Sequence, residues 1–191
     1  MFLSPLLPHA AISDIPDNIK GCRHLAVVDA SINPLCRLPE GFTQLPNLQE
    51  LYLNDTFLEY LPASFGRLSR LRILELRENQ LNTLPKTIVR LTNLQRLDIG
   101  QNDFSELPEV IGSLANLTEL WFDNNKVKSL PPLLGRLKKL LHVDASKNKV
   151  DWVAEEIENC SALTDLHLSS NHLKVCTPLV LLLTIHFLFI F

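Results

Sequence analysis

Leucines recur along most of the chain with a fixed spacing. Cutting the sequence before Leu25 and then at every twenty-third residue gives six consecutive units without an insertion, which span residues 25–162. Each unit approximates LxxLxLxxNxLxxLPxx(I/F)xxLxx, and residues 71–93 show the pattern complete. A seventh copy begins at Leu163, and residues 12–24 match only the second half of a unit. Self-similarity at a fixed period indicates a repeat architecture in which each unit packs on the next.

The LxL segment of each unit predicts a short β-strand. In the third full unit, Leu74 and Leu76 are expected to point inward, because side chains alternate across a strand. Ile73, Glu75 and Arg77 are then expected to face solvent. The stacked units predict an α/β leucine-rich-repeat solenoid, with a curved parallel sheet on the concave face and short helices or turns on the convex face. A helical bundle is disfavoured, because the prolines that follow the fourteenth-position leucines would break its helices.

Asparagines occupy the ninth position of most units, where the chain turns back into the core. A buried carboxamide can bond backbone groups there, which cost about 1–3 kcal/mol each when left unpaired. Thr56 replaces asparagine once and still offers a hydroxyl. Ala154 stands in place of the repeat proline and marks a weak point, while Cys22 and Cys160 take twenty-first-position leucine sites and are expected to be small buried core residues. The ninth-position asparagines are Asn33, Asn79, Asn102, Asn125, Asn148 and Asn171.

Both ends of the sequence depart from the repeat. The apolar tail over residues 175–191 has only Cys176 and His186 as ionisable side chains. As a helix it reaches only about 26 Å, short of the ~30 Å hydrocarbon core of a bilayer. We favour a truncated array with an unrelated terminus; a membrane tail anchor and a makeshift cap are the alternatives. The predicted domains are an atypical N-terminal segment (1–11), which lacks the basic start of a signal peptide, a repeat domain (12–174: partial repeat 12–24, six repeats 25–162, partial repeat 163–174) and the tail (175–191).

Composition narrows the class of protein. A chain of 191 residues with 46% hydrophobic and 20% charged residues fits one folded domain. The net charge of −3 argues against general nucleic-acid binding, which needs a clustered basic surface. The four cysteines are scattered without metal or disulfide spacing, which is typical of reduced thiols in an intracellular protein.

The outward positions of the strands carry an excess of acidic residues. The third, fifth, seventh and eighth positions hold ten acids and three bases, a net charge of −7, while the rest of the chain carries +4. Such a face steers cationic partners, and its aromatic residues suit anchors for a basic, partly apolar peptide. The alternative is that the acids only keep the sheet soluble. The residues predicted to bind a partner protein are Glu50, Tyr52, Glu75, Arg77, Arg96, Asp98, Glu119, Trp121, Asp144 and Asp165.

One group of side chains raises the question of catalysis. His142 and Asp144 occupy the same positions in their strand as Asp165 and His167 in the next, and neighbouring strands lie about 4.8 Å apart. Two imidazoles and two carboxylates can bind zinc. The open face offers no water-excluding pocket, however, so we predict no metal site, no cofactor, no small-molecule substrate and no enzymatic activity.

The exact amino-acid sequences of several repeats are more specific than the 23-residue period. The strings IPDNIK at 15–20, NPL at 33–35, RLPEGFTQL at 37–45, LELREN at 74–79 and LTDLHLS at 163–169 resemble the N-terminal repeat domain of the LAP family, which includes Scribble, Erbin, Densin and Lano. What this resemblance implies is a cytoplasmic scaffold, peripheral at the basolateral or junctional plasma membrane. Family members organise cell polarity, junctions, synapses, signalling and receptor localisation, and their repeat domains bind partners such as the polarity protein Lgl.

The resemblance covers residues 12–174, and VAEEI at 153–157, which lacks the proline, is nearest the Erbin and Densin branch. The longer repeat arrays and the PDZ domain of the family have no counterpart among these residues. Two other functions stay open. The chain is an adaptor in Ras-type signalling, where other intracellular repeat proteins of this period act, or a non-functional truncated product whose coils fray from both ends.

Overall fold

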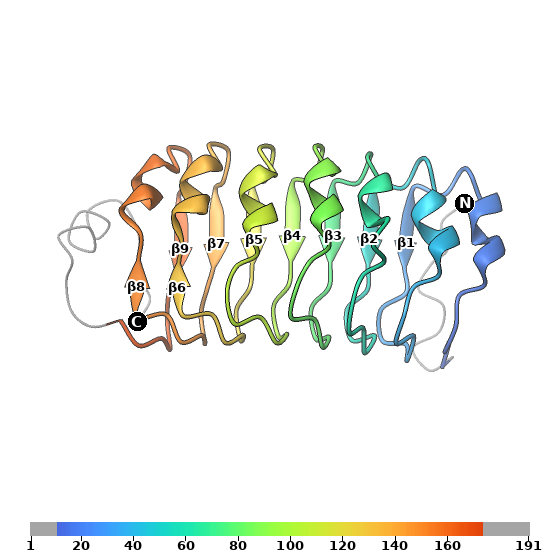
Figure 1. Ribbon diagram of the computed structural model, residues 1–191, viewed down its shortest axis with the longest axis horizontal. Coiled ribbons are helices and arrows are strands. Elements are labelled where there is room, and N and C mark those ends of the chain that lie inside the picture. Colours follow the sequence, from blue (N-terminus) through green and yellow to red (C-terminus); the bar gives the residue numbers. More distant parts are fainter. Residues whose placement is uncertain (1–10, 174–191) are drawn as a thin grey trace.

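The computed structural model describes residues 11–173, and within them seven strands form one parallel sheet, with 3-10 helices stacked on the other side of the array (Figure 1). Each strand pairs with the next at an offset of one repeat, so that Leu51 lies beside Leu74 and Leu74 beside Leu97. The predicted leucine-rich-repeat solenoid and its register are therefore confirmed. The strands of the sheet are β1 (Val27–Asp29), β2 (Glu50–Tyr52), β3 (Ile73–Glu75), β4 (Arg96–Asp98), β5 (Glu119–Trp121), β7 (His142–Asp144) and β9 (Asp165–His167).

The helices are short because the repeat leaves only a few residues between its proline and the next leucine. Pro85 precedes η4 in an extended conformation, with φ −65° and ψ 142°. A fixed φ near this value prepares the chain for the first helical turn. The helices are η1 (Asp17–Gly21), η2 (Glu40–Gln44), η3 (Phe65–Arg67), η4 (Lys86–Arg90), η5 (Glu109–Ser113), η6 (Pro132–Arg136) and η7 (Glu155–Asn159).

The missing proline at Ala154 does not weaken the coil in the way the sequence suggests. Ala154 has φ −66° and ψ 142°, the conformation that proline takes in the other coils. Its backbone N–H donates to the carbonyl oxygen of Leu130 at 2.9 Å, a bond that proline cannot make. This bond extends a second, two-stranded parallel sheet of β6 (Ser129–Leu130) and β8 (Trp152–Val153).

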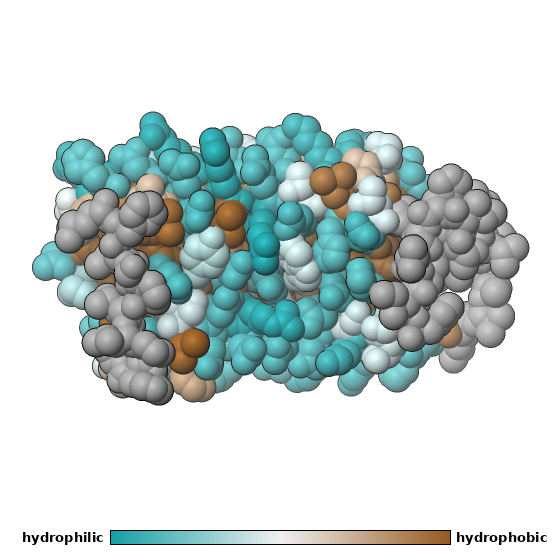
Figure 2. All heavy atoms as spheres, turned by 180° about the vertical axis from the view of Figure 1, so that it is seen from behind, coloured by the Kyte–Doolittle hydropathy of each residue, from teal (hydrophilic) through white to brown (hydrophobic). Residues whose placement is uncertain are grey.

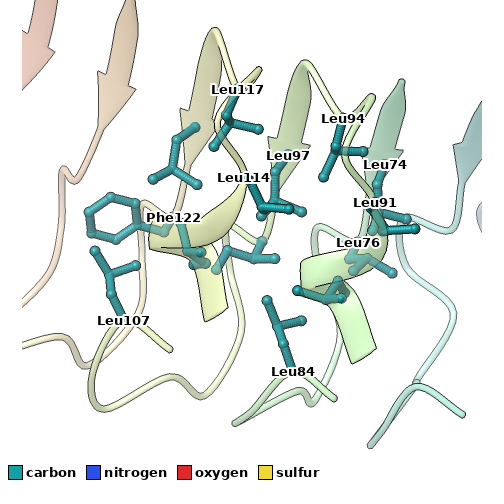
Figure 3. Close-up of a cluster of buried hydrophobic side chains, with 14 of the residues drawn as sticks. Leu74, Leu76, Leu84, Leu91, Leu94, Leu97, Leu107, Leu114, Leu117 and Phe122 are labelled. Atoms are coloured by element: carbon teal, nitrogen blue, oxygen red, sulfur yellow. The ribbon is translucent and has the colours of Figure 1, made fainter. Parts of the chain in front are cut away.

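A single hydrophobic core lies between the sheet and the helices (Figure 3). Strand residues Leu74 and Leu97 and helix-end residues Leu91 and Leu114 are all completely buried. Each buried leucine stabilises the fold by about 1.5–3 kcal/mol relative to an exposed one. Because every coil adds the same layer, stability grows with the number of stacked coils.

The ninth-position asparagines form the expected ladder. The Asn102 Nδ2 group donates to the carbonyl oxygens of Leu76 and Gly100 at 2.8 and 2.9 Å, and its Oδ1 accepts from the Leu81 N–H at 3.0 Å. Thr56 donates its hydroxyl to a backbone carbonyl oxygen at 2.8 Å, as predicted. The ladder satisfies backbone groups of two coils at once, which fixes the turn after each strand.

The residue before each ladder position is left-handed in all seven described coils, with φ between 49° and 57°. These residues turn the chain away from the sheet, so positions eight to twelve form loops along one edge of the array, the lower edge in Figure 1. The left-handed residues are Ile32, Asp55, Glu78, Gln101, Asn124, Lys147 and Ser170.

The two cysteines at leucine sites differ. Cys160 is buried, its thiol lies 3.0 Å from the Leu134 carbonyl oxygen, and burial raises the pKa of the thiol to about 11. The prediction of a core residue is confirmed there. It is wrong for Cys22, which is exposed. Cys22 follows η1, a helix with no buried residue at the end of the described array.

Residues 1–10 and 174–191 lie outside the described part of the chain. The atypical start and the interpretations of the tail fall there and stay predictions. From residue 11 to residue 173, no helix is long and apolar enough to cross a membrane.

Candidate protein-binding face

The ten residues predicted to bind a partner lie on or directly after the strands of the seven-stranded sheet. We call the surface formed by the third, fifth and seventh positions of these strands the sheet face; it is the surface predicted to be concave. Seen from the side opposite to Figure 1, hydrophilic side chains occupy most of the middle of the array (Figure 2). The sheet spaces the side chains of neighbouring coils about 4.8 Å apart, so charges from adjacent strands interact directly.

The Arg77 side chain, which follows β3, extends past β4 to Asp123, which follows β5. Its two terminal nitrogens lie 2.7 Å from the two carboxylate oxygens of Asp123, and its Nη1 lies 3.7 Å from Asp98. Gly100, at the same position of the intervening coil, makes this path available. A Cβ at Gly100 would overlap Arg77 Nη1 and would lie 2.7 Å from Asp123 Oδ1.

The structure corrects the expectation that all the acids of the sheet are exposed. Asp98 and Asp123 keep only 7% and 9% of their surface, because the Arg77 side chain covers them. Burial raises the pKa of Asp98 to about 6, against the opposing effect of the hydrogen bond from the Gly100 N–H and of the Arg77 charge. The hydrogen bond with Asp123 raises the pKa of Arg77 further above its usual range. These two acids therefore serve the fold and are not available to a partner.

Arg96 is also held within the face. Its guanidinium lies 3.1 Å from Glu75 and 3.6 Å from Glu119, and 4.2 Å from the centre of the Trp121 ring. A cation over the face of tryptophan is attracted by the ring quadrupole. One face of Trp121 is thus already occupied, which limits its role as an anchor for a partner.

Tyr52 is tied to its own strand. Its hydroxyl donates to Glu50 at 3.0 Å, and burial together with this bond raises the pKa of Tyr52 to about 12. Tyr52 is half-buried and lies in β2, in the N-terminal part of the sheet. These two residues form a pre-ordered polar and aromatic pair.

Two histidines continue the row of rings from Trp121. The ring centroids of Trp121 and His142 lie 4.9 Å apart, and those of His142 and His167 lie 5.1 Å apart. Burial, and secondly the charge of His167, lower the pKa of His142 against the attraction of Asp144, Asp165 and Glu119. The His142 Nε2 atom is buried without a hydrogen-bond partner among the described residues.

The histidine stack lies in the group of side chains for which the sequence raised the question of a metal. The sequence places two histidines and two aspartates together, and the structure does bring the two imidazole rings into contact. Across residues 11–173, however, no group of three or more His, Cys, Asp or Glu side chains is arranged to hold a metal ion. The rings pack on each other, and this stack was not predicted from the sequence. The sequence pattern that could have revealed it is the placement of ring side chains at the fifth, third and fifth positions of three successive strands.

The chain matches a family model over residues 62–184, which is described as a leucine-rich repeat region. The comparison with curated proteins gives no match.

Solved structures show the same architecture. A leucine-rich-repeat protein of Leptospira interrogans has a TM-score of 0.87 and 30% identity, over 90% of this chain and 44% of its own. The plant peptide hormone receptor RGFR1, solved in complex with RGF2, has a TM-score of 0.73 and 32% identity, over 82% of this chain and 26% of its own. The Toll–Spatzle complex of Drosophila, at 22% identity, a TM-score of 0.74 and coverage of 91% and 27%, shares the fold.

This chain spans less than half of the length of each of these solved chains. The family model covers more than half of the residues, and the repeat, the register and the asparagine ladder agree with it. The chain therefore belongs to the leucine-rich-repeat family.

Proposed function

We propose that the chain is a protein-binding scaffold, not an enzyme, that holds a basic segment of a partner on the sheet face. One observation carries this proposal. Both arginines of the face are held in internal ion pairs, whereas four acids of the sheet face form no salt bridge within residues 11–173. The charge offered to a partner is therefore negative, which speeds the approach of a basic protein. The four acids are Asp29, Glu50, Asp144 and Asp165.

Two of the similar structures support a protein partner. The peptide hormone receptor RGFR1 was solved in complex with RGF2, and Toll in complex with Spatzle. Stacked repeats give an extended surface suited to such ligands.

The finer role rests on the resemblance of the repeats to the LAP family. On this ground we propose a cytoplasmic scaffold, peripheral at the basolateral or junctional plasma membrane, with a role in cell polarity, junctions or synapses. An Lgl-type polarity protein is the partner we propose. An adaptor in Ras-type signalling is the competing role.

A capture experiment tests this proposal. The full chain is immobilised and offered an Lgl-type polarity protein and a Ras-family GTPase side by side. We expect capture of the polarity protein, weakened in an Asp144→Asn/Asp165→Asn variant. A Glu155→Gln/Glu158→Gln variant removes the same charge from η7 in the same part of the array and should bind like the wild type. Capture of the GTPase alone would contradict the polarity role, and equal capture by both variants would contradict the sheet face as the site.

A further inference from the structure

Four lysines lie together in the edge loops that follow β5 and β7. Lys126 and Lys128 take the tenth and twelfth positions of one coil, and Lys147 and Lys149 the eighth and tenth positions of the next. All four are exposed. The Lys149 N–H donates to the Val127 carbonyl oxygen at 2.9 Å, which places Lys149 beside Lys126 and Lys128. We call these four lysines the basic edge.

Most of this charge is not neutralised by the fold. Lys126 lies 2.5 Å from Asp103, an exposed pair that contributes little to stability. The other three lysines form no salt bridge within the described chain. Asp151 takes the position of Lys128 in the next coil, and its backbone N–H donates to the Lys128 carbonyl oxygen at 3.0 Å. In the two preceding coils the eighth and tenth positions carry only acids and amides: Glu78, Gln80, Gln101 and Asp103. The positive charge is thus local to the C-terminal end of the edge.

An exposed tryptophan accompanies the lysines. Trp152 keeps 48% of its surface and pairs with Ser129, the residue after Lys128, in the small β6–β8 sheet. Tryptophan favours the interface between lipid headgroups and acyl chains, and nearby lysines are attracted to anionic lipids. An acidic protein would also fit the lysines and the indole, since tryptophan anchors protein interfaces as well. We favour a lipid surface because a predominantly apolar sequence follows the last coil.

The same edge is where the described chain leaves its last coil, at Leu173 (Figure 1). The sequence that follows, residues 175–191, is predominantly apolar, and Cys176 and His186 are its only ionisable side chains. The apolar stretch of the sequence is therefore attached one coil away from the basic edge.

We infer that the basic edge, together with Trp152, binds the surface of an anionic lipid bilayer. This inference rests on the proposed membrane location but not on the identity of the partner protein. The acids of the sheet face stand mainly at the third and fifth positions of the coils, and the lysines at the eighth to twelfth. Contact with lipid along the edge leaves the sheet face open to a partner.

Vesicle binding of the full chain tests the inference. The protein is sedimented with vesicles of phosphatidylcholine alone and of phosphatidylcholine mixed with phosphatidylserine. We expect binding at least about tenfold tighter on the mixed vesicles, because each lysine near the surface contributes several-fold, and we expect added salt to weaken it. A Lys128→Glu/Lys147→Glu/Lys149→Glu variant should lose this difference.

The matched control is an Arg67→Glu/Lys86→Glu/Arg90→Glu variant, with the same change of charge at exposed positions of η3 and η4. This control variant should retain most of the preference for anionic vesicles. Unchanged binding of the triple lysine variant would overturn the inference, and so would equal binding of the wild type to both vesicles, which would assign the contact to the apolar tail.

Two further arms complete the test. Trp152→Ala should weaken binding to the mixed vesicles several-fold, as expected for an indole at the lipid interface. Binding of polyglutamate without binding of vesicles would overturn the inference in favour of an acidic protein. The Asp144→Asn/Asp165→Asn variant should bind vesicles like the wild type. A failure of the sheet face and a failure of the basic edge are therefore distinguished.

Discussion

The centre and the C-terminal end of the sheet face both carry acids, but only the end leaves them free. In the centre, Arg77 and Arg96 each lie between two carboxylates, and Arg77 covers its pair. At the end, Asp144 and Asp165 flank a pair of stacked histidines, and neither carboxylate forms a salt bridge within the described residues. A count of acidic residues therefore measures the charge of a surface, not the charge that a partner meets.

The largest expected effect is the loss of the buried network. Arg77→Ala leaves Asp98 and Asp123 without a counterion, and breaking a buried pair costs about 3–5 kcal/mol. Because the Arg77 side chain is 31% exposed, we expect about 2–4 kcal/mol, measured by urea denaturation. Arg96→Ala, whose pairs are more exposed, should cost about 1 kcal/mol. Equal losses in the two variants would mean that the centre holds no buried network.

The change of stability with pH should have opposite signs for Asp98 in the centre and for His142 at the C-terminal end of the sheet face. The raised pKa of Asp98, about 6 against 3.8 in the unfolded chain, means that the folded state binds the extra proton between these values. Its contribution to stability therefore falls as pH rises from about 4 to about 6, on the order of 2–3 kcal/mol at 1.36 kcal/mol per pKa unit. Asp98→Asn should remove this fall. The difference in unfolding free energy between the two proteins, measured at each pH, isolates this carboxyl, and a difference that does not change with pH would refute the assignment.

Gly100→Ala should destabilise the centre of the sheet face only by steric overlap. Gly100 does not have a positive φ, so its backbone accepts alanine, but the new Cβ displaces Arg77 or Asp123. We expect a loss of about 1–2 kcal/mol, as for a modest overpacking. In an Arg77→Ala background the same substitution should cost less, because only the overlap with the carboxylates is left, and a double-mutant cycle measures this difference. Additive losses would show that Gly100 does not serve the Arg77 path.

The smallest effect is expected at the end of the face. The lowered pKa of His142 means that the folded state binds fewer protons than the unfolded chain just below the ordinary value of 6.5. Stability should therefore rise with pH through that window, opposite in sign to Asp98. His142→Gln should flatten this rise, in thermal melts taken between pH 5 and pH 7. A rise that persists in the variant would assign it to another group.

The fold was predictable from the sequence because each position repeats its role in every coil. Leu97 is buried and Asn102 bonds two coils for the same reasons as their counterparts one repeat away. The state of the acids was not predictable in this way. Arg77 and Asp123 are 46 residues apart, and their pairing depends on a glycine in the coil between them. A pattern averaged over repeats hides such a contact, although reading the seventh position along the sheet would have shown arginine, glycine and aspartate in a row.

The same limit applies at the ends of the array. Cys22 was expected in the core because its position is a leucine site elsewhere, but a position defines burial only where coils pack on both sides.

The most direct test of the central claim compares two variants that are matched in charge. The dissociation constant of the full chain for a labelled lysine-rich peptide is measured for Asp144→Asn/Asp165→Asn and for Glu75→Gln/Glu119→Gln. Both variants change the overall field equally, so a difference between them reports contact with the peptide. The account predicts that the first variant weakens binding several-fold more than the second. Equal weakening, or a larger effect of the second variant, would contradict the claim that free carboxylates at the end of the sheet hold the partner.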